Sequence, residues 1–383
     1  MIGRQIAERR ARLGLSIEEV GRLSRLSPVE VTAAERDDAE LSISTLEALG
    51  QALAFDPAVI LRGESLPDAR RMPGWFLSHA GEEAEAVSPQ DARLFAVATE
   101  LGRTGAFLRE LVGDPPPGLD DLRGDLTPID AEEPWRLGYR LGEQARQALA
   151  LAYPALRSDA PLVSVQKTLE DLGVHVAHVS FYSLARYAVS IVGPGAMPII
   201  LLNLATERSA QRVARRAVLA HELSHLLHDS GEAVLPSMPR QPTHYVGAIE
   251  QRANAFAPAF LAPPSGLRDA PAGASPDDVV RTIAVRWGLM AEGAIWHAKN
   301  CGFISGTTAE ELVSDTAFRR DVSRRACETA VWEPDIVRDD ARDQGLDVDT
   351  TSLVAGLVQG LVLRALRGGL ISSGRAKEIL TLA

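Results

Sequence analysis

The most constraining feature of this 383-residue chain is the pentapeptide from His221 to His225, which reads His-Glu-Leu-Ser-His. The preceding run 215–220 contains neither glycine nor proline, so the motif is expected to lie on a helix. Residues four apart on a helix lie on one face, one turn above each other. Two imidazoles at that spacing can bind one Zn²⁺ ion, with Glu222 beside the open coordination position. The pentapeptide therefore predicts a metal centre in which Glu222 takes a proton from an activated water.

A zinc centre that catalyses hydrolysis needs a third protein ligand, and Glu250 lies 25 residues after the motif. Glu250 begins a helical stripe that continues through the apolar residues Ala253, Phe256, Ala257 and Phe260. A carboxylate on the buried face of a helix costs several kcal/mol unless it is paired or bound to a metal. We therefore predict that His221, His225 and Glu250 bind Zn²⁺. The alternative is an exposed glutamate in a first helical turn, where the helix dipole favours it.

Three further polar residues near the motif are candidates for supporting roles. His228 lies about 10 Å beyond His221 along the helix axis, at a rise of about 1.5 Å per residue, which is too far to share the ion easily. We expect His228 beside the ligands or on the substrate side, with a plain structural histidine as the alternative. His244 and Tyr245 precede the Glu250 helix and are candidates to donate hydrogen bonds to an oxyanion, or are ordinary loop residues.

Composition excludes several classes of protein. No apolar run approaches the roughly 18 residues that a bilayer span needs, and the charged N-terminus lacks the apolar stretch of a signal peptide. The formal net charge of -11 argues against a chain that wraps nucleic acid with its whole surface. Cys301 and Cys327 are too few for a disulfide framework. We therefore expect a soluble cytoplasmic protein that does not enter a membrane.

The chain divides into four segments, residues 1–65, 66–131, 132–265 and 266–383. The first is a series of short helices, the second has the irregular composition of a linker with one or two helices, and the last is helical. In the third segment, three strands are predicted among helices, at Val174–Val179, Tyr187–Val192 and Met197–Leu204. These features predict an α+β fold in which a small three-stranded sheet accompanies the motif helix.

The motifs of the third segment resemble the ImmA/IrrE family of metallopeptidases over about residues 135–264. The resemblance rests on the His221–His225 motif, on the strand that ends at Asn203, and on Glu250 followed by Ala253, Asn254, Phe256 and Ala257. It implies that Zn²⁺ is bound by His221, His225 and Glu250, with Glu222 as the general base. Ser224 stands where the family usually has glycine, and a small residue is thereby kept.

This family resemblance also implies a kind of substrate. Such proteins typically cleave, or promote the cleavage of, helix-turn-helix repressors, and so activate mobile-element, stress or DNA-damage genes. In metallopeptidases of this kind an extended substrate pairs with an edge strand beside the motif helix. Met197–Leu204 is the candidate edge strand, with an ordinary core strand as the alternative.

Residues 1–65 resemble the Xre-type helix-turn-helix domain of phage repressors. The resemblance rests on Leu13-Gly14-Leu15-Ser16 before the second helix and on Glu35-Arg36 at the end of the recognition helix. One departure is Ile17, where the family commonly has glutamine. The residues expected to face DNA are Ser27, Val29, Glu30, Thr32 and Arg36.

The charge of this first segment is unusual for a DNA reader. The predicted reading face offers little that binds guanine or phosphate, and residues 1–65 carry eleven acidic against eight basic side chains. Domains that read DNA usually show a basic footprint. The sequence therefore leaves open whether the domain binds DNA or pairs with another repressor-like protein.

The leading hypothesis is a zinc-dependent endopeptidase that cleaves a helix-turn-helix repressor-type protein and so derepresses stress or mobile-element genes. One alternative is a non-proteolytic DNA-binding transcriptional regulator whose zinc-site domain senses a ligand. Another is an interaction module of a toxin–antitoxin or defence locus. The presence of Glu222 favours the enzyme, because a sensor needs no base beside the metal. The sequence also leaves a homodimer open.

Overall fold

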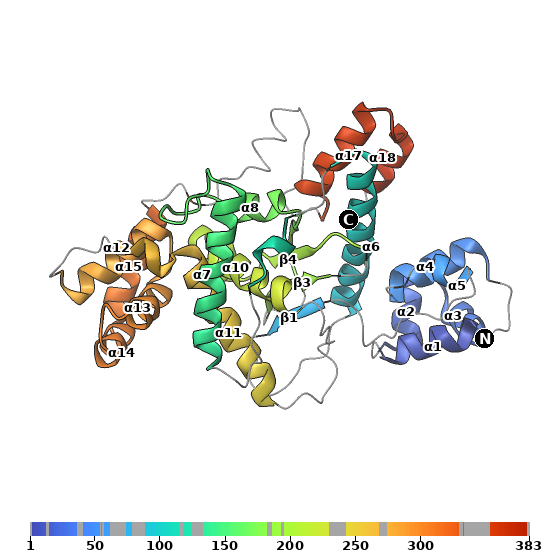
Figure 1. The fold of residues 1–383 in the computed structure, drawn as a ribbon. Coiled ribbons are helices and arrows are strands. Elements are labelled where there is room, and N and C mark those ends of the chain that lie inside the picture. The colour runs from blue at the N-terminus through green and yellow to red at the C-terminus, as the bar shows by residue number, and fades with distance from the viewer. Residues whose placement is uncertain are drawn as a thin grey trace.

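The computed structural model is mainly helical and has one small sheet near its centre (Figure 1). It describes residues 2–12, 15–36, 41–53, 55, 57–61, 74–78, 89–114, 118–124, 133–181, 186–192, 195–229, 243–267, 274–328, 332 and 353–380. Within these ranges, no helix combines the length and the apolar character that crossing a bilayer requires.

The N-terminal domain is built from short helices that share one apolar core. These are α1 (Ile2–Arg12), α2 (Ile17–Ser24), α3 (Pro28–Glu35), α4 (Ile43–Leu53) and α5 (Pro57–Leu61). Ser16 and Ser27 begin α2 and α3, each in a capping box with the glutamate three residues later. Residues from all five helices, Ile6, Val20, Val31, Leu49 and Ile60 among them, close the core. The succession α2–turn–α3 is the helix-turn-helix that the sequence predicts.

The sheet contains the three predicted strands and a fourth one. Its strands are β1 (Gly74–Ser78), β2 (His175–Val179), β3 (Arg186–Ile191) and β4 (Ile199–Asn203), in the order β1-β3-β4-β2. β2 and β4 run parallel, whereas β3 runs antiparallel to both of its neighbours. All three predicted strands are present, and β1 adds a fourth from the segment 66–131, which the sequence indicated as a linker with helices.

Of the two interpretations of Met197–Leu204, the core strand is confirmed and the edge strand is wrong. β4, which covers Ile199–Asn203 of that range, lies between β3 and β2, and all five of its residues are buried. Its continuous apolar run places hydrophobic side chains on both faces of the sheet, which is typical of a central strand. β3 therefore takes the place beside the motif helix that had been assigned to β4.

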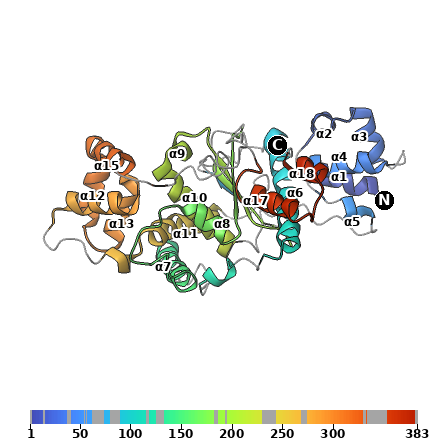
Figure 2. The same cartoon turned by 90° about the horizontal axis from the view of Figure 1, so that it is seen from above.

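Helices cover both faces of the sheet (Figure 2). One face packs against the helices α7 (Pro134–Ala152), α8 (Val165–Asp171), α10 (Arg212–His228) and α11 (Thr243–Leu261). The other face packs against the helices α6 (Pro89–Leu111), α17 (Leu357–Arg367) and α18 (Ser373–Leu380). Alternate residues of β3 separate the two cores: Ala188 belongs to the first, and Val189 and Ile191 belong to the second.

Two glycines of α7 let α11 approach unusually closely. A Cβ atom on Gly138 would lie 2.2 Å from the carbonyl oxygen of Arg252, and one on Gly142 would lie 2.5 Å from that of Phe256. Only glycine fits at such distances. This close contact fixes α11 against α7, and α11 carries Glu250.

The C-terminal segment contributes to two separate places in the fold. The helices α12 (Pro276–Trp287), α13 (Ala291–Asn300), α14 (Gly306–Ser314) and α15 (Thr316–Glu328) extend the core that contains the motif helix. α17 and α18 instead lie against α6 on the other side of the sheet (Figures 1 and 2). The buried guanidinium of Arg216 ties α10 to the α12 end, because it donates to the carbonyl oxygens of Trp287 and Gly288.

Candidate metal centre

The two histidines of the motif lie on one face of α10, as their spacing predicts. His221 and His225 are 3% and 0% exposed, and their Nε2 atoms are 2.9 Å apart. Nearly all of α10 is buried, so its sequence tolerates polar side chains only where they find partners. The two imidazoles therefore meet in a buried environment with their Nε2 atoms directed at the same point.

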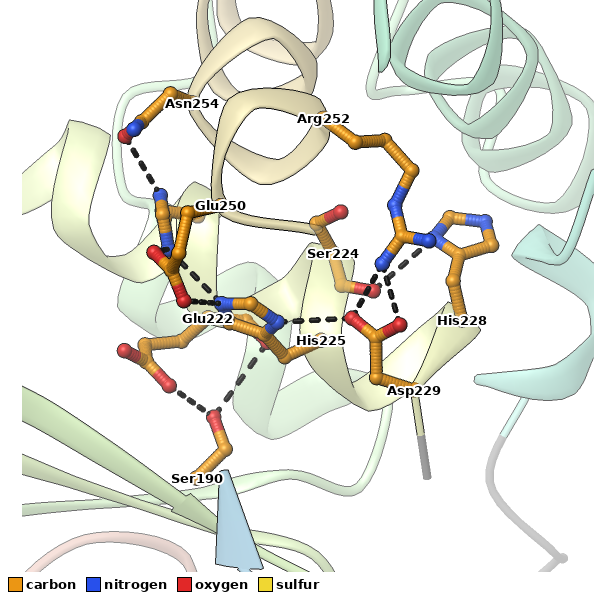
Figure 3. Close-up of polar contacts among 10 residues, drawn as sticks. Ser190, Glu222, Ser224, His225, His228, Asp229, Glu250, Arg252 and Asn254 are labelled. Carbon is orange, nitrogen blue, oxygen red and sulfur yellow. Dashed lines mark hydrogen bonds and ion pairs between the residues drawn. The ribbon is translucent and has the colours of Figure 1, made fainter. Parts of the chain in front are cut away.

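Glu250 completes this group from the neighbouring helix (Figure 3). Its carboxylate oxygens lie 3.3 Å from His221 Nε2 and 3.6 Å from His225 Nε2. One donor atom from each of the three residues lies within 4.8 Å of the others. The structure thus brings together the three residues that the sequence predicts as ligands.

The outer nitrogens of both imidazoles are held by oxygen atoms. His221 Nδ1 lies 3.0 Å from Asn254 Oδ1, and His225 Nδ1 lies 2.8 Å from Asp229 Oδ2. Because each Nδ1 faces an acceptor, each carries the proton, and each Nε2 presents a lone pair. Two lone pairs and the Glu250 carboxylate then converge, an arrangement that favours a bound cation. Three ligands of the His₂Glu type fit a catalytic Zn²⁺.

Asp229 belongs to a buried ion pair that sequence reasoning missed. Asp229 and Arg252 are each 4% exposed, and the guanidinium of Arg252 contacts both carboxylate oxygens. Burial works to raise the pKa of Asp229, but the hydrogen bond from His225 and the charge of Arg252 outweigh it and hold the pKa below its usual range. A signal was present in the sequence, because Asp229 follows His225 by one helical turn.

Glu222 lies between the histidines and the sheet. Its side chain is fully buried, and the hydroxyl of Ser190 on β3 donates to its Oε2 atom (Figure 3). In the described part of the chain, Glu222 Oε1 has no hydrogen-bond partner. Burial raises the pKa of Glu222 to about 7. A carboxylate with a pKa near neutrality is suited to accept and return a proton, and Ser190 keeps it in place.

His228 lies away from the three converging donor atoms. Its Nδ1 is 3.0 Å from the carbonyl oxygen of Ser224, and its ring packs edge-on against Phe256. Burial, followed by the positive charge of Arg252, lowers the pKa of His228 to about 4, so the ring is neutral at physiological pH. The structure therefore places His228 beside the Asp229–Arg252 pair rather than among the ligands.

His244 and Tyr245 fall in the first turn of α11, which begins at Thr243. They are thus helical rather than part of a loop before the helix. Their side chains lie outside the described residues, so the predicted contact with an oxyanion stays a prediction.

A cavity of about 950 Å³ opens beside His221. Its walls come from α7, β3, α9 (Glu207–Ala210), α10, α11, α13 and α15, and they include the aromatic residues Trp135, Tyr139, Tyr187 and Trp296. Arg208 and Arg319 add positive charge to the lining. The cavity gives a ligand much larger than water access to the metal centre.

The predicted DNA-facing residues surround the start of α3. Ser27, Val29, Glu30 and Arg36 are exposed, and Thr32 is half-buried. Ser27 and Glu30 hydrogen-bond each other in the capping box, which holds the pKa of the Glu30 carboxyl below its usual range. The eight residues of α3, Pro28–Glu35, include no basic side chain. The face is therefore accessible, but it has no excess of positive charge.

Comparisons with known proteins agree with both resemblances. Residues 169–294 match the family model of the IrrE N-terminal-like domain, which is a peptidase family, and residues 2–62 match that of a helix-turn-helix domain. No curated protein and no solved structure gave a match. The first match spans the motif helix and α11, and the second spans α1–α5. The chain thus contains two regions that match known family models, one of a helix-turn-helix domain and one of an IrrE N-terminal-like peptidase domain.

Proposed function

We propose that this chain is a zinc-dependent endopeptidase whose substrate is a helix-turn-helix repressor-type protein. The observation that carries the proposal is the convergence of His221 Nε2, His225 Nε2 and the Glu250 carboxylate beside the buried carboxylate of Glu222. When bound, Zn²⁺ supplies the Lewis-acid chemistry that activates water and polarises a peptide carbonyl. A purely structural zinc site is closed by four protein ligands, whereas this group offers three.

In the proposed hydrolysis, each polar residue of the site has its own role. Glu222 accepts the proton of the attacking water and returns it to the leaving amine. Ser190 holds the Glu222 carboxylate through Oε2, which leaves Oε1 for that proton. Asn254 and Asp229 keep the Nδ1 proton on each histidine, so that both Nε2 atoms remain available as ligands.

The proposed role of the N-terminal domain is substrate recognition. We propose that it brings a repressor to the metal centre, either by pairing with the repressor or by binding DNA beside it in the cytoplasm. Because α3 lacks basic residues, we expect sequence-specific DNA affinity to be weak and strongly dependent on salt. Nanomolar, sequence-specific binding of the full chain at physiological salt would contradict this reading of the surface.

The runner-up function is a regulator that binds zinc and senses a ligand without cutting anything. The cavity beside His221 favours this candidate, because it is large enough for a small molecule. The two functions differ in whether they require Glu222, because a peptidase needs a general base and a ligand sensor does not.

The test compares Glu222→Gln with His225→Ala. Each is produced with repressor-type proteins encoded near its gene, and both repressor cleavage and zinc content are measured. Glu222→Gln keeps the shape of the side chain but cannot take the proton, so we expect retained zinc and a cleavage rate lower by at least about 10²-fold. His225→Ala should lose zinc and cleavage together. If Glu222→Gln still derepresses target genes normally in cells, the peptidase function is refuted and the regulator takes its place.

A further inference from the structure

The edge of the sheet beside the metal centre is covered by a strand from the chain's own N-terminal half. β1 pairs antiparallel with β3, and the pairs are Gly74 with Ile191, Trp75 with Ser190 and Phe76 with Val189. Figure 3 shows β1 next to Ser190, below Glu222 and the histidines. β1 therefore lies along the strand that carries Ser190, the hydrogen-bond partner of the proposed general base.

β3 is the strand to which an extended substrate would have to add. It is the neighbour of the motif helix, and its Ser190 hydroxyl donates to Glu222. Its other edge is already paired with β4. A peptide that joins a sheet edge gains main-chain hydrogen bonds along its length. The edge of β3 that offers such bonds near Glu222 is the edge that β1 occupies.

We propose that residues 74–78 are an internal competitor of the substrate, a strand that fills the peptide-docking edge of β3 and must leave before an external segment can pair there. The proposal rests on the proposed peptidase function for its consequence, slower cleavage. Its structural part, competition for one sheet edge, stands on the strand pairing alone.

The short length of the β1–β3 ladder suits a strand that has to be displaced. Regular pairing runs over three residues, and the register then slips between Phe76 and Ser78. Where Phe76 pairs with Val189 and Ser78 with Arg186, β3 has one extra residue, which is the pattern of a bulge. By contrast, β2 and β4 pair over five consecutive residues without a slip. Because fewer consecutive residues are paired, separating β1 from β3 should cost less free energy than separating β2 from β4.

The sequence of β1 also indicates what an external competitor looks like. The strand reads Gly-Trp-Phe-Leu-Ser, three large apolar residues between two small ones. The partner that fits the edge is therefore an extended peptide segment with a central run of aromatic and aliphatic residues, presented antiparallel to β3.

The experiment measures binding of the peptide that corresponds to residues 72–80, labelled with fluorescein, to the full-length protein. All variants carry Glu222→Gln, so that the peptide is not cut. In one variant, Trp75→Pro and Phe76→Pro remove the backbone donors of β1. In a second, residues 74–78 are replaced by a glycine–serine sequence of equal length. Phe76→Tyr, which keeps every backbone donor, is the matched control.

We expect the peptide to bind both disrupted variants at least about tenfold more tightly than the unmodified chain or Phe76→Tyr. An edge that is blocked nine-tenths of the time weakens apparent binding by that factor. Amide hydrogen exchange supplies the second readout: exchange in residues 186–191 should accelerate in the disrupted variants and slow again when the peptide is added. Continued protection of β4 would show that the sheet itself is intact.

Two outcomes would overturn the proposal. Equal peptide affinity for the disrupted variants and for Phe76→Tyr would mean that β1 does not block the edge. Cleavage of the active chain within residues 74–78, detected by mass spectrometry, would mean that the segment is a substrate rather than a competitor. Neither result depends on whether a repressor is cut, so a failure here is distinguishable from a failure of the proposed peptidase function.

Discussion

The substitution Asp229→Asn tests whether the buried ion pair serves the metal centre or only the fold. The carboxylate of Asp229 contacts His225 Nδ1 at 2.8 Å and the guanidinium of Arg252. The change keeps the shape of the side chain but removes its charge. Loss of a carboxylate that orients a metal-binding histidine typically lowers metal affinity by about 10- to 100-fold, or about 1.4–2.8 kcal/mol.

The same substitution leaves the guanidinium of Arg252 buried without a carboxylate. Removing one member of a buried ion pair costs about 3–5 kcal/mol of the free energy of unfolding. In the double variant Asp229→Asn/Arg252→Met both charges are absent, so most of that loss should be recovered. The zinc affinity should stay low, because His225 still lacks its anionic partner. Stability and metal affinity are therefore expected to separate.

The assay combines competitive zinc titration against a coloured chelator at pH 7.5 with urea unfolding of the metal-free protein. Metal is left out of the unfolding experiment because a ligand that binds the native state adds its own stabilisation. Asn254→Ala is the matched control: it removes the neutral partner of His221 Nδ1, and we expect a smaller loss of zinc affinity, about fivefold. Zinc affinity of Asp229→Asn within threefold of wild type would refute the argument, as would joint recovery of affinity and stability in the double variant.

Three further predictions follow from the packing and the buried groups. Gly138→Ala should lower the free energy of unfolding by about 1–3 kcal/mol and weaken zinc binding by displacing α11. Gly247→Ala, whose Cβ would meet no described residue within 4 Å, should do neither; thermal unfolding and zinc titration check both variants. Burial lowers the pKa of His297 from 6.5 to about 4, so its full contribution to the free energy of unfolding should be present above pH 6.5. Acidification to pH 5 should remove about 2 kcal/mol of that contribution. In urea unfolding, His297→Gln should lack this part of the dependence of stability on pH. Ser190→Ala removes a hydrogen bond that lowers the pKa of Glu222. In the pH profile of kcat/KM for repressor cleavage, the acid limb should therefore move to higher pH. An acid limb that does not move would count against Glu222 as the general base.

The convergence of His221, His225 and Glu250 was predictable because its signals are local. The spacing of His221 and His225 fixes their common helical face, and Glu250 begins the stripe that packs α11 onto α10. Asp229 obeys the same four-residue spacing from His225 and could have been found in that way. All of these relations follow from helix periodicity within one or two helices.

The parts of the site that lie on the sheet were not predictable from local patterns. Ser190 meets Glu222 only because β3 packs against α10, and the two residues are 32 positions apart. β1 reaches β3 across more than 100 residues, and nothing in a run of three apolar residues fixes which strand it joins. The wrong assignment of β4 to the edge had a usable warning, however, since Ile199–Leu202 is apolar at every position.

The arrangement of charges explains why a second buried carboxylate can lie so near the ligands. Glu250 and Glu222 are the two carboxylates beside the point where the histidine Nε2 atoms converge, and the charge of Glu250 works to raise the pKa of Glu222. A bound dication offsets both charges, whereas Asp229 is offset separately by Arg252. With Zn²⁺ in place, the charges of Glu222, Glu250, Asp229, Arg252 and the ion would therefore sum to zero. Without it, the low dielectric of the site favours a proton on Glu222, so metal binding and the readiness of the base are coupled through the same charges.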